Sequence, residues 1–260
     1  MCKLTIMMNC LNGDKFLIEA LNSIINQSYK DWHLYFFDNQ STDESKKIFH
    51  SFSDPRLKYF YFDQTYDLGI ARKKAWNCIK SEYVAICDVD DVSLNGRFQE
   101  QVQFLDSHCD YGVVGTNVYL IDDNSNIFKE IKYSKTNESL NNQIEYKHVF
   151  NSATLMFRKK AVDKIGGYNS NYEMVNDYDL LYKISRKFKL GNISKTLVCN
   201  RLHKNNLSFK KIVKGQTELL TFYLSIYKNT SSFSNKINLI INICKTFLRI
   251  IYHFIKSIIK

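Results

Sequence analysis

The sequence predicts an α/β fold with a mostly parallel central sheet, followed by C-terminal helices. Short apolar segments rich in β-forming residues alternate with helical segments through the first half of the chain, as in parallel sheets with crossover helices. Of the 260 residues, 45% are hydrophobic and 24% are charged, which indicates a globular protein with a sizeable core. A single proline and nine glycines leave no segment with the composition of a flexible linker.

The first half of the chain predicts strands and helices in strict alternation. Strands are expected at residues 3–10, 33–38, 57–62 and 83–87, and helices at 14–27, from about 42, at 69–80 and at 95–107. In open sheets of this order, ligands bind beyond the carboxyl ends of the strands. Polar clusters lie at two of these ends, at residues 38–43 and 88–91. We therefore expect a binding site between these clusters.

The second half of the chain is less regular. Strands are expected at residues 112–121, 153–157 and 195–201, a helix at 176–187, and further helices from about 209. This pattern predicts one domain over residues 1–208 and a helical extension over residues 209–260.

The cysteines and the N-terminal segment favour the cytoplasm. Seven cysteines are scattered with no CxxC pair and no zinc-ligand spacing, which suits a reducing compartment. The apolar run within residues 1–12 is too short for a signal peptide and has the length of a buried strand. We therefore expect a cytoplasmic protein.

The net charge of +10 is unevenly distributed. Residues 183–260 contain 16 Lys and Arg but a single acid, Glu218, whereas the rest of the chain is net negative. Such an asymmetry indicates a surface for an anionic partner, either nucleic acid or a membrane.

Three carboxylates, Asp88, Asp90 and Asp91, directly follow the predicted strand Tyr-Val-Ala-Ile-Cys. Like charges so close together repel each other unless a cation lies between them. Hard oxygen ligands suit Mg2+ or Mn2+, which also bind phosphate oxygens. The alternative is an acidic turn in solvent, but such a turn does not require three acids after a buried strand.

Four other side chains are candidates, three of them with a structural alternative. Asp38 can accept a hydrogen bond from a nucleotide or form an Asx turn. Arg72 can neutralise a diphosphate. Asp177 can act as a general base or favour the dipole of the helix that starts there. His203 is a metal ligand or a surface histidine.

Five segments occur in an order and spacing that resemble a known family. They are "LTIMMNCLNGDKFLIEALNSIINQSYKDWHLYFFDNQSTDES", "GIARKKAW…SEYVAICDVDDVSLNGRFQEQV", "LMFRKKAVDKIGGYNSN", "NDYDLLYKI" and "NRLHKNNLS". Together they resemble the family 2 inverting glycosyltransferases of the GT-A nucleotide-sugar fold, of the kind found in bacterial O-antigen, capsule or lipooligosaccharide assembly. The resemblance extends from Leu4 to about Ser208.

The resemblance implies a role for each candidate. Asp38 would bind the uracil of a UDP-sugar, Arg72 would lie near the base or phosphates, and Asp88 would contact the ribose. Asn39 stands where many members have a second Asp, and it would contact the base through its side-chain amide. An amide can still hydrogen-bond a base.

The resemblance also implies the metal and the base. Asp90 and Asp91 would hold Mn2+ or Mg2+ on the diphosphate, with Asp91 as the preferred direct ligand, and His203 would approach the same ion. Asp177 would take the proton from the acceptor hydroxyl. Asn176 replaces the family's usual Glu, which leaves Asp177 as the base. A hexose such as glucose would then pass from an α-linked donor to a β-linked product.

Residues 236–260 predict an amphipathic helix. At 100° per residue its Asn, Lys, Arg and His side chains share a narrow stripe, and apolar side chains cover most of the remainder. This pattern suits a helix in an anionic membrane interface, and the alternative is packing on the domain or in a dimer. We expect a peripheral protein on the inner face of the cell membrane with a lipid-linked saccharide acceptor.

Two other functions are considered. A nucleotidyltransferase of similar fold would carry a Gly-rich, Lys-containing phosphate loop after the first strand, and residues 9–14 contain none. A membrane- or nucleic-acid-binding protein without transferase activity would leave the acidic cluster unexplained. We therefore expect no nucleic-acid partner.

Overall fold

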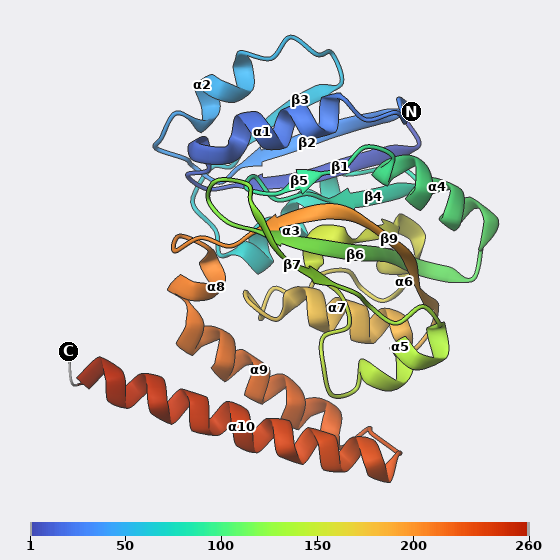
Figure 1. Cartoon of the computed structure of the whole chain (residues 1–260), viewed down its shortest axis with the longest axis vertical. Coiled ribbons are helices and arrows are strands. Elements are labelled where there is room, and N and C mark those ends of the chain that lie inside the picture. Colours follow the sequence, from blue (N-terminus) through green and yellow to red (C-terminus); the bar gives the residue numbers. More distant parts are fainter. Residues whose placement is uncertain (1, 259–260) are drawn as a thin grey trace.

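The computed structural model describes residues 2–258, with side chains as far as His253 (Figure 1). Its first half contains β1 (Leu4–Cys10), β2 (Trp32–Asp38), β3 (Leu57–Tyr61) and β4 (Tyr83–Ile86), which pair in parallel in the order β3-β2-β1-β4. The intervening helices are α1 (Asp14–Ile25), α2 (Ser45–His50) and α3 (Leu68–Cys78), and α4 (Arg97–Ser107) follows. The predicted alternation of strands and helices is confirmed.

The second half extends the same sheet beyond β4. β8 (Met156–Arg158) is antiparallel to β4 and to β6 (Tyr111–Ile121), and β9 (Lys189–Arg201) is parallel to β6. The short β5 (Val92–Ser93) and β7 (Ile127–Ile131) pair antiparallel with β9 and β6. The remaining elements are α5 (Asn137–Gln143), the 3-10 helix η1 (Ser152–Thr154), α6 (Lys159–Lys164) and α7 (Asn176–Ser185).

β1 and β4 are buried on both faces, which explains why they read as mainly apolar runs. Leu4, Ile6 and Met8 of β1 pack with α1, α2 and α4 on one face. Met7 belongs to the opposite face, where α3, α6 and α7 pack. The parallel strands therefore place Asp38 and the acidic cluster at one rigid edge.

Some predicted boundaries were wrong. The strand expected at 153–157 begins at Met156, because Asn151 accepts a hydrogen bond from the N–H of Ala153 (3.0 Å) and starts the turn η1 instead. The strand expected at 195–201 is the end of a longer one that begins at Lys189. β7 and α5 were not predicted, since β7 is almost wholly exposed and has no buried face to set a pattern.

Three helices end the chain: α8 (Leu207–Lys210), α9 (Ile212–Tyr227) and α10 (Phe233–Ile258). α9 and α10 form a hairpin below α7 (Figure 1). Phe222 of α9 is buried with its ring centroid 4.6 Å from that of Tyr178 in α7. Leu239 of α10 is also buried in this core. No helix within residues 2–258 is both long and apolar enough to span a bilayer.

Candidate active site

The candidate residues gather at the carboxyl ends of β2 and β4. Asp38 is the last residue of β2, and the acidic loop of residues 88–91 lies between β4 and β5. The buried Arg97 of α4 donates to the carbonyl oxygen of Ile86 (2.9 Å) and to the hydroxyl of Ser93 (2.9 Å). It therefore fixes the loop on both sides, although the sequence analysis did not identify it.

Asp38 and Asn39 hold the neighbouring loops. Asp38 is fully buried and accepts hydrogen bonds from the Tyr59 hydroxyl and the Ser41 N–H. The second bond comes from the N–H three positions further on, whereas an Asx turn, the structural alternative for Asp38, bonds the N–H two positions on. The Asn39 amide exchanges two hydrogen bonds with the backbone of Tyr66, at 2.7 and 2.9 Å. The expected contacts of both side chains with a base remain predictions.

The carboxylates of the acidic loop repel one another, and a nearby cation would relieve this repulsion. Burial, together with the charge of Asp90, raises the pKa of Asp88 to about 6, although Arg72 lowers it. Burial also raises the pKa of Asp91 well above its usual range, as do the charges of Asp90 and Asp88. A divalent ion nearby would favour the charged forms of these carboxylates.

Asp90 and Asp91 have different partners. The carboxylate of Asp91 accepts hydrogen bonds from the Asn200 side chain (2.9 Å) and from the Arg201 N–H (2.8 Å). One oxygen of Asp90, Oδ2, lies 2.9 Å from Nε2 of His203 and 3.1 Å from Nδ2 of Asn206. The structure thus joins His203 to the acidic loop across 113 positions of sequence.

This donor set fits an ion that is shared with a diphosphate. Among the described residues, no three Asp, Glu, His or Cys side chains form a group that could hold a metal alone. Mg2+ in nucleotide sites usually has one or two carboxylate ligands completed by substrate phosphates and water. Asp90 and His203 supply an oxygen and an imidazole nitrogen side by side, and imidazole is also a ligand for transition metals.

Asp177 lies in the first turn of α7 and is held from α3. Arg72 is buried, and its Nη1 donates to Oδ2 of Asp177 and to Oδ1 of Asn176 (2.8 Å). Its Nη2 lies 3.6 Å from Oδ1 of Asp88. One guanidinium therefore connects the acidic loop with the predicted base.

The second oxygen of Asp177 is buried and has no hydrogen-bond partner among the described residues. The hydroxyl of Tyr168 is likewise buried and unpartnered. Burial and the charge of Asp177 raise the pKa of Tyr168 well above its usual range, so this phenol stays protonated. Asp179 lies outside this group, because it pairs with Lys183 on the same helix (2.6 Å).

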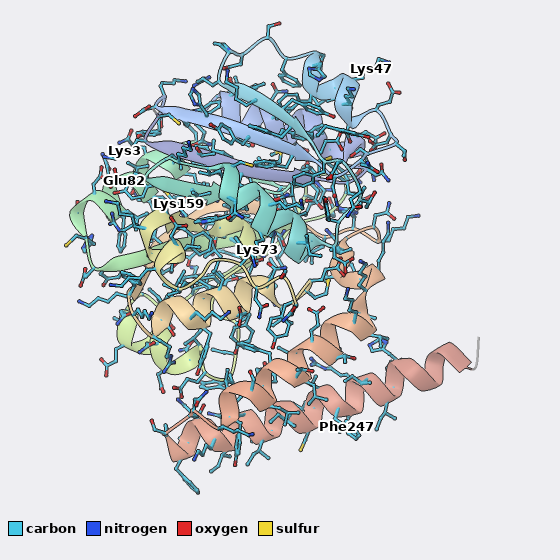
Figure 2. All side chains as sticks on the ribbon, turned by 180° about the vertical axis from the view of Figure 1, so that it is seen from behind. Lys3, Lys47, Lys73, Glu82, Lys159 and Phe247 are labelled. Carbon is cyan, nitrogen blue, oxygen red and sulfur yellow. The ribbon has the colours of Figure 1, made fainter. Side chains whose placement is uncertain are left out.

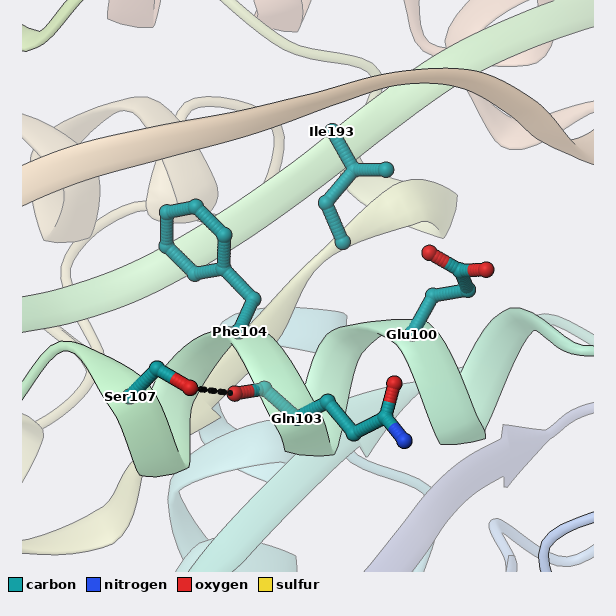
Figure 3. A pocket seen from close by; sticks show the side chains of 5 residues that line it. All are labelled: Glu100, Gln103, Phe104, Ser107 and Ile193. Atoms are coloured by element: carbon teal, nitrogen blue, oxygen red, sulfur yellow. Dashed lines mark hydrogen bonds between the residues drawn. The ribbon is translucent and has the colours of Figure 1, made fainter.

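Sequence reasoning missed several of these neighbours. Tyr168, Asn200 and Asn206 lie inside the segments quoted above, but only the structure reveals what they contact. A separate hollow of about 400 Å³ between α4 and β9, lined by Glu100, Phe104 and Ile193, contains none of the candidate residues (Figure 3).

The chain is similar to proteins of one family. The family model described as "Glycosyl transferase family 2" matches residues 5–166. The O-antigen biosynthesis glycosyltransferase WbnJ of Escherichia coli is 30% identical, covering 95% of this chain and 93% of the relative. An uncharacterized glycosyltransferase of Methanocaldococcus jannaschii is 26% identical over 86% of this chain and 79% of its own length.

Solved structures share the fold. S. aureus TarS 1–349 has a TM-score of 0.69 at 18% identity, covering 94% of this chain and 71% of that one. The mannosyltransferase PcManGT of Pyrobaculum calidifontis, solved with GDP-Man and Mn2+, has a TM-score of 0.70 at 14% identity, covering 93% of this chain and 69% of that one. The predicted GT-A fold is confirmed by these neighbours.

Proposed function

Since the chain belongs to glycosyl transferase family 2, we propose that it transfers a hexose from a UDP-sugar to a hydroxyl group of a saccharide acceptor. Asp177 carries this proposal, because it is a buried carboxylate with one oxygen held by Arg72 and the other without a hydrogen-bond partner in the described part of the chain. A general base needs such an unoccupied acceptor atom. The similarity to an O-antigen glycosyltransferase supports a role in surface polysaccharide assembly.

The donor would lie along the carboxyl ends of β2 and β4. Asp38 and Asn39 would contact the uracil, and Asp88 would contact the ribose. Arg72 would lie near the phosphates, where a guanidinium offers two parallel N–H donors. The burial of Arg72 supports its role, since Asn176 and Asp177 fix this side chain before a ligand arrives.

Asp90, Asp91 and His203 would hold Mn2+ or Mg2+ together with the donor diphosphate. When bound, the ion would neutralise the charge that develops on the departing nucleoside diphosphate. The hydrogen bond between Asp90 and His203 supports this assignment, because it brings two ligand types together at the acidic loop. PcManGT, which has the same fold, was solved with Mn2+.

Asp177 would then accept the proton of the acceptor hydroxyl. The acceptor hydroxyl gives its proton to Oδ1 of Asp177 while its oxygen attacks the anomeric carbon opposite the leaving group. An α-linked donor thus yields a β-linked product without a covalent enzyme intermediate. The bond from Arg72 holds Oδ2, so the carboxylate presents Oδ1 in one orientation.

We further propose that α10, in the helical extension of residues 209–260, attaches the protein to the inner face of the cell membrane. The outward side of α10 is apolar and exposed, with Ile237, Ile240, Ile241, Phe247, Leu248 and Ile251 between 40% and 64% accessible. Figure 2 shows Phe247 on the side of α10 that faces away from the rest of the protein. Exposed apolar patches of this extent mark interaction surfaces.

Basic residues flank this apolar side. Lys245 and Arg249 are exposed next to it, and cations in this position attract anionic lipid headgroups. The inward side of α10 is held by Asn235, which donates to Glu145 (2.7 Å), and by Asn242, which donates to the Tyr146 carbonyl (2.6 Å). A lipid-linked saccharide would suit an enzyme attached in this way.

Replacing the base tests the proposed chemistry. Asp177→Asn should lower turnover about 10²–10⁴-fold, the usual contribution of general base catalysis, with donor affinity nearly unchanged. Purified protein would be screened with UDP- and GDP-sugars and Mn2+ or Mg2+, and nucleoside diphosphate release would be measured. Asp179→Asn is the matched control, because this nearby acid is bonded to Lys183. If the wild-type protein neither binds nor hydrolyses any nucleotide sugar, the proposal is wrong.

A further inference from the structure

The loop of residues 169–175 leads directly into the helix that carries Asp177. Its last three backbone N–H groups, those of Glu173, Met174 and Val175, all donate to one carboxylate, that of Glu218 in α9. The shortest distances are 3.0, 2.8 and 3.2 Å. Glu218 is the single acid among residues 183–260, and no role proposed above uses it.

A second set of contacts, made by Glu173, also holds this loop against α9. Glu173, only 4% exposed, accepts from Lys211 (2.6 Å) and lies 2.7 Å from Nζ of Lys214, both at the start of α9. Burial alone would raise the pKa of Glu173, but these two lysines hold it below its usual range. Lys214 also donates to Asp67 (2.9 Å), which precedes α3. The loop is thus tied to α9 and, through Lys214, to the start of the helix that carries Arg72.

The backbone of this loop also packs closely against α3. A Cβ atom on Gly69 would lie 2.0 Å from the carbonyl oxygen of Tyr172, so only glycine permits this approach. Arg72, three positions further along α3, donates to Asn176 and Asp177. Asp177 is therefore held by α3 and directly follows a loop that Glu218 fixes.

We propose that Glu218 is a positioning residue, which acts through the loop of residues 173–175 to orient Asp177. This inference rests on the proposed function of Asp177 as the base. An ionised carboxylate suits the task because its two oxygens accept several N–H groups at once, and charge-assisted bonds are stronger than neutral ones. α9 is then part of the catalytic unit as well as the link to α10.

Glu218→Ala removes the shared acceptor and tests the inference. It should lower kcat about 10²-fold through misplacement of the base, while KM for the donor stays within about threefold. Glu218→Gln retains an acceptor oxygen and should recover most of the lost turnover. Thr221→Ala is the matched control, because this exposed residue lies about one turn further on and its hydroxyl donates to the Thr217 carbonyl within α9.

Hydrogen exchange of peptides spanning residues 170–178 provides a readout that needs no substrate. Exchange should rise in Glu218→Ala, and it should stay at the wild-type level in Thr221→Ala. Unchanged exchange in Glu218→Ala overturns the inference, as does faster exchange with unchanged kcat. Absence of transfer by the wild-type protein would instead contradict the proposed function, so the two failures are distinguishable.

Discussion

The proposed membrane surface can be tested without truncating α10. Phe247 and Leu248 are 54% and 64% exposed, so Phe247→Ser together with Leu248→Ser removes apolar surface without opening a cavity. Truncation would be a poorer test, because Leu239 and Asn235 on the inward side of the same helix are buried. We expect the double variant to fold normally and to bind vesicles weakly.

The magnitude follows from the exposed fractions. Complete burial of a Leu or Phe side chain contributes about 1.5–3 kcal/mol. Since roughly 54–64% of each side chain remains available to a bilayer, the pair should contribute about 2–3.5 kcal/mol. At about 1.4 kcal/mol per tenfold change, vesicle affinity should fall roughly 30- to 300-fold. Lys245→Gln with Arg249→Gln should cost about 2 kcal/mol on anionic vesicles and little on neutral ones.

Co-sedimentation with anionic and with neutral vesicles measures these losses. The matched control is Ile127→Ser with Phe128→Ser, an apolar pair on β7 that is 57% exposed at each position. This control should bind vesicles like the wild-type protein. Equal losses in both double variants, or no loss in either, would refute the membrane surface. If the wild-type protein is a dimer and only the α10 variant becomes monomeric, this face is a dimer interface instead.

Three further predictions concern the acidic loop. Asp90→Asn should weaken Mn2+-dependent donor binding, measured by calorimetry, with the melting temperature nearly unchanged. Asp91→Ala should cost about 1–3 kcal/mol of folding stability in denaturant titrations, because it leaves the buried N–H of Arg201 without its acceptor. The raised pKa of Asp88, about 6, means that the folded state disfavours the charged form. The metal-free protein should therefore lose stability as pH rises from 4 to 7, and Asp88→Asn should flatten this dependence in thermal melts.

Much of the fold could be predicted because its signals are local. The buried strands β1 and β4 read as mainly apolar runs, and a polar residue lies two positions beyond each strand end. The prediction failed where the structure of a strand depends on contacts with residues that are distant in the sequence. β9 shifts register against β6 near Asn117, which interrupts any regular alternation along this long strand. β7 pairs along one edge only and presents side chains mainly to solvent, so neither of its faces carries an apolar pattern.

The site was predictable in its residue types but not in its pairings. Three acids after a buried strand indicate an ion or a nucleotide wherever they occur, so the acidic loop was found from sequence alone. The hydrogen bonds made by Asp90 and Asp91 decide which of their carboxylate oxygens is left for a ligand. The partners in these bonds are Asn200, Arg201 and His203, which lie more than 100 positions away in the sequence.

Glu218 illustrates the same limit most clearly. In sequence it is a lone acid among sixteen basic residues, and nothing nearby indicates a partner. Its hydrogen-bond partners are backbone N–H groups. Every residue except proline has such a group, so no side-chain pattern can reveal these partners. Glu218 becomes the acceptor for three N–H groups only because α9 packs against the loop that precedes α7. A residue that acts on the backbone in this way has to be found from the structure.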